Sequence, residues 1–224
     1  MELYLIRHGQ STNNVLADER ERVCDPPLTE LGWRQSERLA EHLADSRRGY
    51  GITRLYTSPM WRALQTAKLV GQALGLPVEV WIELHESGGV YLDHGEAGGI
   101  VAYPDKTRSE MLAEFPDYVL PEGVTEEGWW RGEGREDWPA CHGRAIRVAE
   151  QLRQWAAGGE RIAVISHGGF FNALLKALLN QLPGRHLWYE HNNTGISRVD
   201  FLPEGRLRVQ FLNRIEHLPP EWVS

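Results

Sequence analysis

The chain has 224 residues, of which 42% are hydrophobic and 25% charged, and its formal net charge at pH 7 is −7. These proportions are ordinary for a soluble globular protein. The acidic balance argues against a general nucleic-acid binder, and no apolar run approaches the roughly 20 residues that a membrane helix needs. We therefore expect no nucleic-acid and no membrane partner.

The amino terminus and the two cysteines bear on the compartment. The chain begins in an apolar run with no basic segment before it, which predicts no secretory signal and a cytoplasmic location. Cys24 and Cys141 are far apart in sequence. Two reduced thiols are the expected state, although one disulfide stays an alternative.

The first ninety residues alternate between strand and helix patterns. Three strands are predicted, at residues 3–6, 52–57 and 78–80. Thr29 is typical of an N-cap and predicts a helix to about residue 46. Ser58 and Pro59 predict the start of a second helix, which ends near Gly75.

The second half opens with a long segment, residues 88–139, that has no clean period apart from one predicted helix over 108–115. The elements predicted after it are a helix at 142–157, a strand at 161–166, a helix at 170–180 and strands at 195–201 and 207–212. Alternating strands and helices predict an α/β three-layer sandwich, in which helices flank a mostly parallel central sheet.

Two of the predicted strands end in the same dipeptide. His8-Gly9 follows the first strand, and His167-Gly168 follows the strand at 161–166. Ligands of open α/β sheets bind at the carboxyl ends of strands, so two imidazoles could meet at one edge of the sheet. The adjacent Arg7 adds a cation and favours an anionic ligand.

Several ordered motifs make the chain similar to the histidine phosphatase superfamily, also called the phosphoglycerate mutase-like family. They are RHGQS at 7–11, Asn14, PLTELG at 27–32, SPMWRALQTA at 58–67, LHE at 84–86 and SHGG at 166–169. The resemblance implies one domain over residues 1–224 of this fold. Residues of about 88–140 match no family pattern and are expected to be an inserted lid. No metal and no other cofactor is expected.

The resemblance also assigns roles. His8 is the expected nucleophile, because a neutral imidazole nitrogen can form a phosphohistidine. Arg7 and Arg62 are the expected phosphate clamps, since a guanidinium offers a planar fork of donors to phosphate oxygens. His167 is expected to bind the phosphoryl group during its transfer.

Further site residues are expected from the same motifs. Asn14, rather than its neighbour Asn13, is expected to donate to phosphate, and Gly168 to offer a backbone N–H at a helix start. Gln10, within the first motif, is also expected to bind the substrate.

Glu86 is the expected general acid, which protonates the leaving oxygen and then activates water. Glu83 is its rival, three residues earlier. The family pattern is Leu-x-Glu, which fits residues 84–86, but the residues after Glu86 depart from the family's usual sequels.

Phosphoglycerate mutases usually follow the acid with Arg-His-Tyr-Gly and later carry two adjacent arginines, and neither feature occurs after Glu86. We therefore expect a metal-independent phosphatase that acts on a small phosphorylated substrate. The alternatives are a mutase and a non-catalytic phospho-ligand binder. The sequence leaves the substrate and a possible homodimer open.

The insertion is expected to decide the substrate. Its tryptophans either form an apolar wall or pack the lid on the core, and its arginines either contact a second anionic group or are solvated; these residues are Trp129, Trp130, Trp138, Arg108, Arg131 and Arg135. Asn193 and Thr194 are expected to border the site. The acidic run at 93–96 is interpreted as a solvated loop and not as a metal site.

Overall fold

A computed structural model describes residues 1–184 and 186–224. Its centre is a six-stranded sheet with the strand order β3-β2-β6-β1-β7-β8. The strands are β1 (Glu2–Arg7), β2 (Arg54–Thr57), β3 (Val78–Val80), β6 (Arg161–Ser166), β7 (Ile196–Phe201) and β8 (Leu207–Arg214). The first four in spatial order are parallel, and β7 and β8 pair antiparallel at one edge. The predicted mostly parallel sheet is confirmed.

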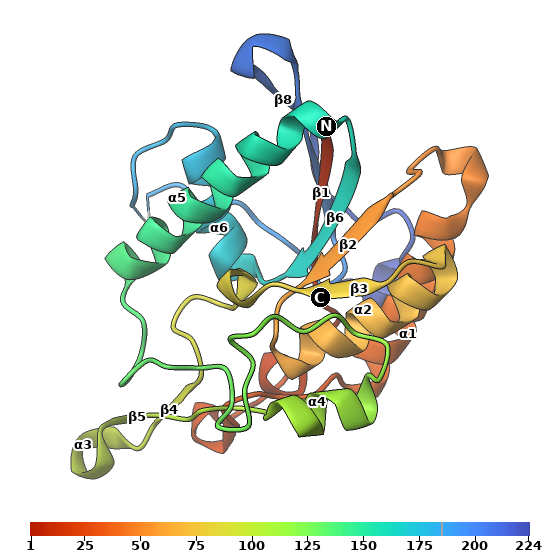
Figure 1. The fold of residues 1–224 in the computed structure, drawn as a ribbon. Helices are drawn as coiled ribbons and strands as arrows, with labels where there is room; N and C mark the ends of the chain where they lie inside the picture. The colour runs from red at the N-terminus through yellow and green to blue at the C-terminus, as the bar shows by residue number, and fades with distance from the viewer. Residues whose placement is uncertain (185) are drawn as a thin grey trace.

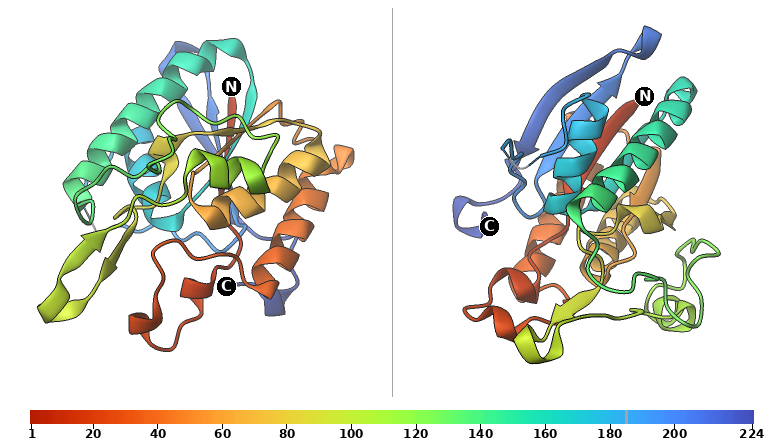
Figure 2. Two further views of the ribbon diagram at one scale, coloured as in Figure 1. Left: turned by 60° about the horizontal axis from the view of Figure 1, so that its bottom comes forward. Right: turned by 90° about the vertical axis from the view of Figure 1, so that its left-hand side faces the viewer.

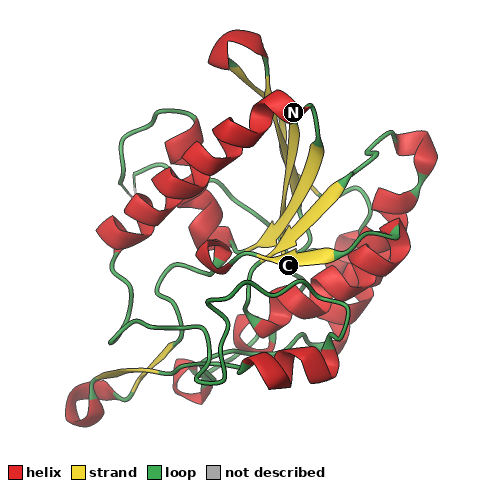
Figure 3. Ribbon diagram, viewed as in Figure 1, coloured by secondary structure: helices red, strands yellow, loops and turns green. Residues whose placement is uncertain are grey.

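Helices cover both faces of this sheet, as Figures 1 and 3 show. They are α1 (Glu30–Ala44) and α2 (Trp61–Leu74) on one face, and α5 (Trp138–Trp155) and α6 (Gly168–Leu178) on the other. The central strand β1 is buried on both faces: Leu3 and Leu5 pack in the cluster of α5 and α6, whereas Tyr4 and Ile6 pack with α1 and α2. A strand buried on both faces needs a continuous apolar run, which explains the opening sequence.

The ends of two helices differ from their predicted positions. Helix α2 begins at Trp61 and not at Ser58, because the carboxylate of Asp25 accepts the Trp61 N–H at 2.7 Å. Helix α5 begins at Trp138, four residues before the predicted start. There Asp137 accepts the Ala140 N–H at 2.8 Å, and a proline in the first turn loses no helical hydrogen bond.

The insertion is a folded segment. Its elements are β4 (Tyr91–Asp93), α3 (Gly95–Gly98), β5 (Ile100–Ala102) and α4 (Arg108–Glu114). The helix predicted over 108–115 is confirmed, and Thr107 with Glu110 forms its capping box. The β4–β5 hairpin was not predicted, because strands of three residues carry too little alternation. The hairpin projects from the body of the molecule in Figure 1.

Most of the remaining insertion lies against α2 and β3. Met111, Phe115 and Trp129 are buried in one cluster with Met60 and Leu64. Of the two alternatives for the tryptophans, Trp129 therefore fits packing, since only 2% of its surface is exposed. Among the described residues, no helix is long and apolar enough to cross a bilayer. Both cysteines are free thiols.

The cap of α5 gives a test of its position. Replacing Asp137 by Ala should lower the free energy of unfolding by about 1 kcal/mol, because the Ala140 N–H loses its acceptor. Urea denaturation measures the change. The matched control is Asp117→Ala, an exposed acid outside the helices, which should change stability by less than about 0.5 kcal/mol. An equal effect of both substitutions would contradict the capping role.

Candidate active site

The register of two neighbouring strands sets the site. β1 and β6 are parallel, and Arg7 is paired with Ser166, so the residues that follow leave the sheet together. These residues are His8 and His167, whose ring centroids are 5.0 Å apart with their planes at 58°. The two His-Gly strand ends therefore meet at one edge of the sheet.

The hydrogen bonds of His8 fix its tautomer. Its Nδ1 lies 2.6 Å from the carbonyl oxygen of Gly9. A carbonyl oxygen only accepts, so Nδ1 carries the proton and Nε2 keeps its lone pair. The Nε–H of Arg62 donates to that Nε2 at 3.1 Å. His8 is therefore held with a nucleophilic nitrogen beside a guanidinium.

The surroundings keep both imidazoles uncharged. Burial, and then the positive charges of Arg62 and Arg7, hold the pKa of His8 well below its usual value of 6.5. Burial and the charge of Arg62 lower the pKa of His167 in the same way. Both rings are therefore neutral at pH 7.

His167 is oriented by the hydroxyl of Ser58, a residue that the sequence predicted only as a helix cap. Its Nε2 lies 2.7 Å from Ser58 Oγ, which accepts the Met60 N–H at 3.3 Å. The Ser58 hydroxyl can donate to Nε2, and in that tautomer the proton of the neutral ring lies on Nδ1. This Nδ1 is buried and has no partner among the described residues. In that tautomer it is a donor left for a ligand.

The two arginines are held by different partners. Arg62 binds Asp25 through NH1 and Oδ1 at 3.1 Å, and the side chains are 9% and 3% exposed. Arg7 donates through NH1 to the carbonyl oxygen of His191 at 2.6 Å. Its Nε is buried and bonded to no described residue, so it too has a donor to offer.

Glu86, but not Glu83, lies with these groups. Its carboxylate accepts the N–H groups of Ser87 at 2.7 Å, Phe170 at 2.8 Å and Gly169 at 3.2 Å, at the amino end of α6. A Cβ at position 169 would lie 2.6 Å from Glu86 Oε1, so the approach requires a glycine. Glu83 instead pairs with Arg147 at 2.9 Å.

These groups surround a cavity of about 200 Å³. Its lining residues are Arg7, His8, Ser11, Asn13, Asn14, Arg22, Cys24, Pro26, Met60, Arg62, Glu86, Ser87, Gly89 and Tyr91. His167 and Gly168 are not in the lining and lie next to it: His167 stands against His8, and a Cβ on Gly168 would be 3.6 Å from Arg7 Nε. Two guanidiniums, two imidazoles and a carboxylate at one cavity fit a phosphate ester.

Comparison with known proteins identifies the family. A sequence profile of the histidine phosphatase superfamily (branch 1) matches residues 3–214. The chain belongs to the histidine phosphatase superfamily. The relative named "Probable phosphoglycerate mutase GpmB" from Yersinia enterocolitica is 27% identical over 201 residues, which are 90% of this chain and 85% of that protein.

Solved structures of the superfamily share the fold. A phosphoserine phosphatase from Entamoeba histolytica, in complex with phosphoserine, superposes with a TM-score of 0.64 at 21% identity, over 97% of this chain and 99% of that one. A mycobacterial glucosyl-3-phosphoglycerate phosphatase bound to VO3 gives 0.61 at 22% identity, over 95% and 98%. The three-layer fold predicted from the sequence is thus that of this superfamily.

The segment after the first motif supplies two asparagines with different surroundings. Asn14 Oδ1 accepts from the N–H and the hydroxyl of Ser11, which leaves its amide N–H groups without a described partner. Asn13 uses both ends of its amide on the backbone of Val23. Both line the cavity, but the free donors belong to Asn14.

Gln10 does not face the cavity, contrary to its expected role in binding substrate. Its Oε1 accepts from the hydroxyl of Thr29 at 2.8 Å, and its N–H donates to Gln35 at 2.8 Å. Both partners belong to the start or the body of α1. The side chain of Gln10 therefore ties the catalytic loop to that helix.

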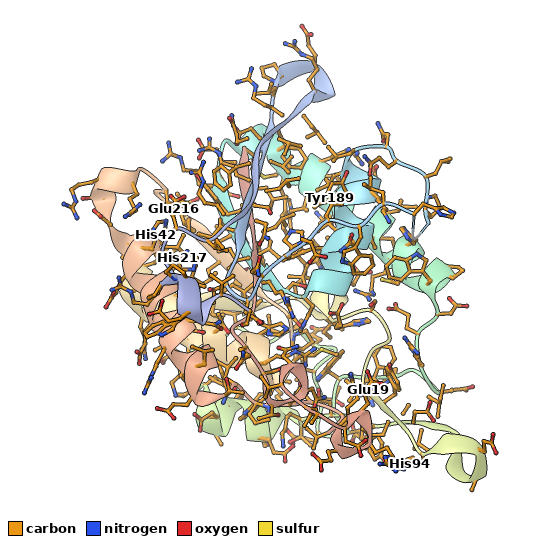
Figure 4. The ribbon with its side chains drawn as sticks, turned by 180° about the vertical axis from the view of Figure 1, so that it is seen from behind. Glu19, His42, His94, Tyr189, Glu216 and His217 are labelled. Atoms are coloured by element: carbon orange, nitrogen blue, oxygen red, sulfur yellow. The ribbon has the colours of Figure 1, made fainter. Side chains whose placement is uncertain are left out.

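Asn193 and Thr194 hold the end of β1. Thr194 N–H donates to the Arg7 carbonyl at 3.0 Å, and Asn193 Nδ2 donates to the His8 carbonyl at 3.0 Å. The Thr194 hydroxyl in turn lies 3.0 Å from Nε2 of His217, whose ring stands 5.2 Å from that of His42. Figure 4 shows His42 and His217 next to each other, to one side of the sheet. Asn193 and Thr194, which were predicted to border the site, therefore support the backbone of Arg7 and His8.

The three arginines of the insertion lie outside the cavity lining, and so do Trp130 and Trp138. Arg108 donates to the carbonyls of residues 121 and 124, Arg131 donates to those of residues 127 and 128, and Arg135 lies over the ring of Tyr91. Trp130 packs against His85, with ring centroids 4.9 Å apart. None of these residues therefore meets the phosphate cavity directly.

Sequence reasoning missed several residues of the cavity. Arg22 is exposed at its rim, and Tyr91 reaches it from β4. Figure 2 shows the hairpin beside the loop at 12–24 in both views. Asp25 was missed as the partner of Arg62. These residues come together only because their segments meet in the folded chain, and no local sequence pattern predicts that contact.

The lowered pKa of His8 has a direct test. The imidazole should stay neutral between about pH 5 and pH 8, where an unperturbed histidine titrates, so its NMR resonances should not shift over that range. Replacing Arg62 by Gln removes a neighbouring cation and should move the pKa of His8 upward. A wild-type ring that titrates near 6.5 would contradict this description.

Proposed function

We propose that the protein is a metal-independent phosphatase that hydrolyses a small phosphomonoester through a phosphohistidine on His8. The observation that carries this proposal is the fixed tautomer of His8. Because Nδ1 is bound to the Gly9 carbonyl, the lone pair of Nε2 is available without loss of a proton. The low pKa of the ring keeps this form present at neutral and mildly acidic pH.

The first half-reaction moves the phosphoryl group to the enzyme. The Glu86 carboxylate, which accepts three N–H groups in the free protein, first takes up a proton from solvent as the anionic substrate enters. His8 Nε2 then attacks phosphorus while the bond to the leaving oxygen breaks and Glu86 gives that oxygen its proton. Arg7, Arg62 and the Nδ1–H of His167 donate to the other phosphoryl oxygens, whose charge they stabilise. The Arg62 Nε–H that rests on His8 Nε2 must turn to the phosphate when the substrate binds.

The second half-reaction returns the enzyme to its starting state. Glu86, now a carboxylate, accepts a proton from water, and the resulting hydroxide oxygen attacks the phosphohistidine. The P–N bond breaks, and orthophosphate leaves. The two guanidiniums supply the positive charge that phosphoryl transfer needs, and this supports a reaction that proceeds without a divalent ion.

A second candidate function is phosphoglycerate mutase activity, which the name of the Yersinia relative favours. In a mutase the phosphohistidine returns its phosphoryl group to a sugar-acid phosphate and not to water. The residues that follow Glu86 favour hydrolysis. Ser87 and Gly89 line the cavity there, so those positions offer no cation to a substrate carboxylate.

The first test is release of phosphate from a panel of phosphomonoesters in EDTA. Wild type should release phosphate, and His8→Ala should lower the rate by on the order of 10³-fold or more, because the nucleophile is gone. The matched control is His94→Ala, an exposed histidine of the hairpin, which should keep the wild-type rate. Intact-mass detection of a phosphorylated enzyme in wild type alone would support the intermediate.

A parallel assay separates the two reactions. 3-Phosphoglycerate is supplied with and without 2,3-bisphosphoglycerate, and both phosphate and 2-phosphoglycerate are measured. Isomerisation without phosphate release would favour the mutase. Neither product from any ester would leave only a phospho-ligand binder and would overturn the phosphatase proposal.

The choice of general acid is tested by two matched amides. Glu86→Gln should lower kcat by about 10²- to 10⁴-fold, because the leaving oxygen loses its proton donor. Glu83→Gln should leave kcat within about twofold, since surface ion pairs such as Glu83–Arg147 contribute little. The two rates are measured on the best ester of the panel, and the reverse ranking would assign the acid to Glu83.

A further inference from the structure

Two buried carboxyl groups from distant segments meet behind Arg62. Asp25 precedes α1, whereas Asp105 lies in the insertion between β5 and α4. Their carboxyl groups face each other within reach of a hydrogen bond. Only 3% of the Asp25 side chain is exposed. A buried acid pair beside a catalytic cation needs a physical account, because two adjacent buried charges of like sign are costly.

Asp25 fixes the position of the Arg62 guanidinium. Its Oδ1 accepts from Arg62 NH1 at 3.1 Å, and its Oδ2 accepts the Trp61 N–H at 2.7 Å. One carboxylate therefore both caps α2 and holds Arg62, the second residue of that helix. At its other end the same guanidinium donates to His8 Nε2.

Asp105 brings the insertion to this pair. Its Oδ2 accepts from Trp129 Nε1 at 2.9 Å. Its backbone has a φ of +62°, a left-handed conformation that aspartate and asparagine tolerate better than most residues. The ammonium group of the next residue, Lys106, lies 5.5 Å from the centre of the Trp61 ring. The insertion thus contacts the first turn of α2 at the point that carries Arg62.

A hydrogen bond between two carboxyl groups requires one proton. Burial, together with the negative charge of Asp25, raises the pKa of Asp105 well above its ordinary value. Burial also raises the pKa of Asp25, but the charges of Arg62 and Lys106 and the Trp61 N–H favour its ionised form. The proton therefore resides on Asp105.

The other titratable groups around the pair do not supply this proton. Arg62 and Lys106 are the cations that face it, and Cys24 is the neighbouring thiol. Burial raises the pKa of the Cys24 thiol, so it stays uncharged.

We propose that Asp105 is a positioning residue: as a carboxylic acid it donates to Asp25, and so holds the Asp25–Arg62 pair in place and makes the phosphate clamp depend on the insertion. This inference rests on the role of Arg62 in the proposed function. Loss of the proton would put a second negative charge beside Arg62, which weakens the attraction of the guanidinium for a phosphate.

Asparagine is the informative replacement at position 105. Its amide N–H can donate to Asp25, its oxygen can accept from Trp129, and it tolerates the left-handed backbone, so Asp105→Asn imitates the protonated acid at every pH. Asp105→Ala removes the donor. Asp117→Asn, an exposed acid of the same insertion, is the matched control.

The experiment measures binding of inorganic phosphate by calorimetry and hydrolysis of p-nitrophenyl phosphate, both as a function of pH. Asp105→Asn should bind phosphate as wild type does at neutral pH and lose less affinity than wild type as the pH rises. Asp105→Ala should bind about tenfold more weakly, because the carboxylate that orients the arginine loses its partner. Asp25→Asn should weaken binding at least as much, and thermal denaturation verifies that each variant is folded.

The outcomes separate this inference from the proposed function. Wild-type phosphate affinity and an unchanged pH profile in both Asp105 variants would overturn the positioning role, even if all hydrolyse the ester. The predicted order of phosphate affinities without ester hydrolysis would overturn the phosphatase and keep the positioning role. An Asp105→Asn variant as impaired as Asp105→Ala would also overturn the role of the proton.

Discussion

The parallel pairing of β1 with β6 is the constraint on which the site depends. Its register joins Arg7 to Ser166, and therefore delivers His8 and His167 to the same edge with their rings 5.0 Å apart. A slip of one residue would turn every side chain of β1 to the other face, where its apolar residues would lose their partners. Burial of the strand on both sides thus fixes the relative position of the two histidines.

The same burial determines the charge states of the site. Withdrawal from water, with two guanidiniums nearby, favours the neutral form of both imidazoles. The guanidiniums are held in turn by Asp25 and by the carbonyl of His191. A cationic pocket can therefore exist in a chain of net charge −7, because local charge and not the total decides what binds.

The insertion takes part in the site in two ways. Tyr91 of β4 is part of the cavity wall, and Asp105 reaches the carboxylate that holds Arg62. Its tryptophans pack the segment onto α2 and the core, as Trp129 does. A fold does not by itself determine the substrate, so we expect segments such as this one to decide it.

The sequence by itself determined the order of the strands and helices of the central sheet and its two faces, the cap at Thr29 and the two His-Gly strand ends, because periodicity and turn residues act over a few positions. It placed the starts of α2 and α5 wrongly, and missed the β4–β5 hairpin, Arg22 and Tyr91. Only the tertiary structure showed that Asp25 contacts Arg62 and that Ser58 contacts His167, although these residues are remote from one another in the chain. Their roles arise from contacts between distant segments, and such contacts leave no local pattern.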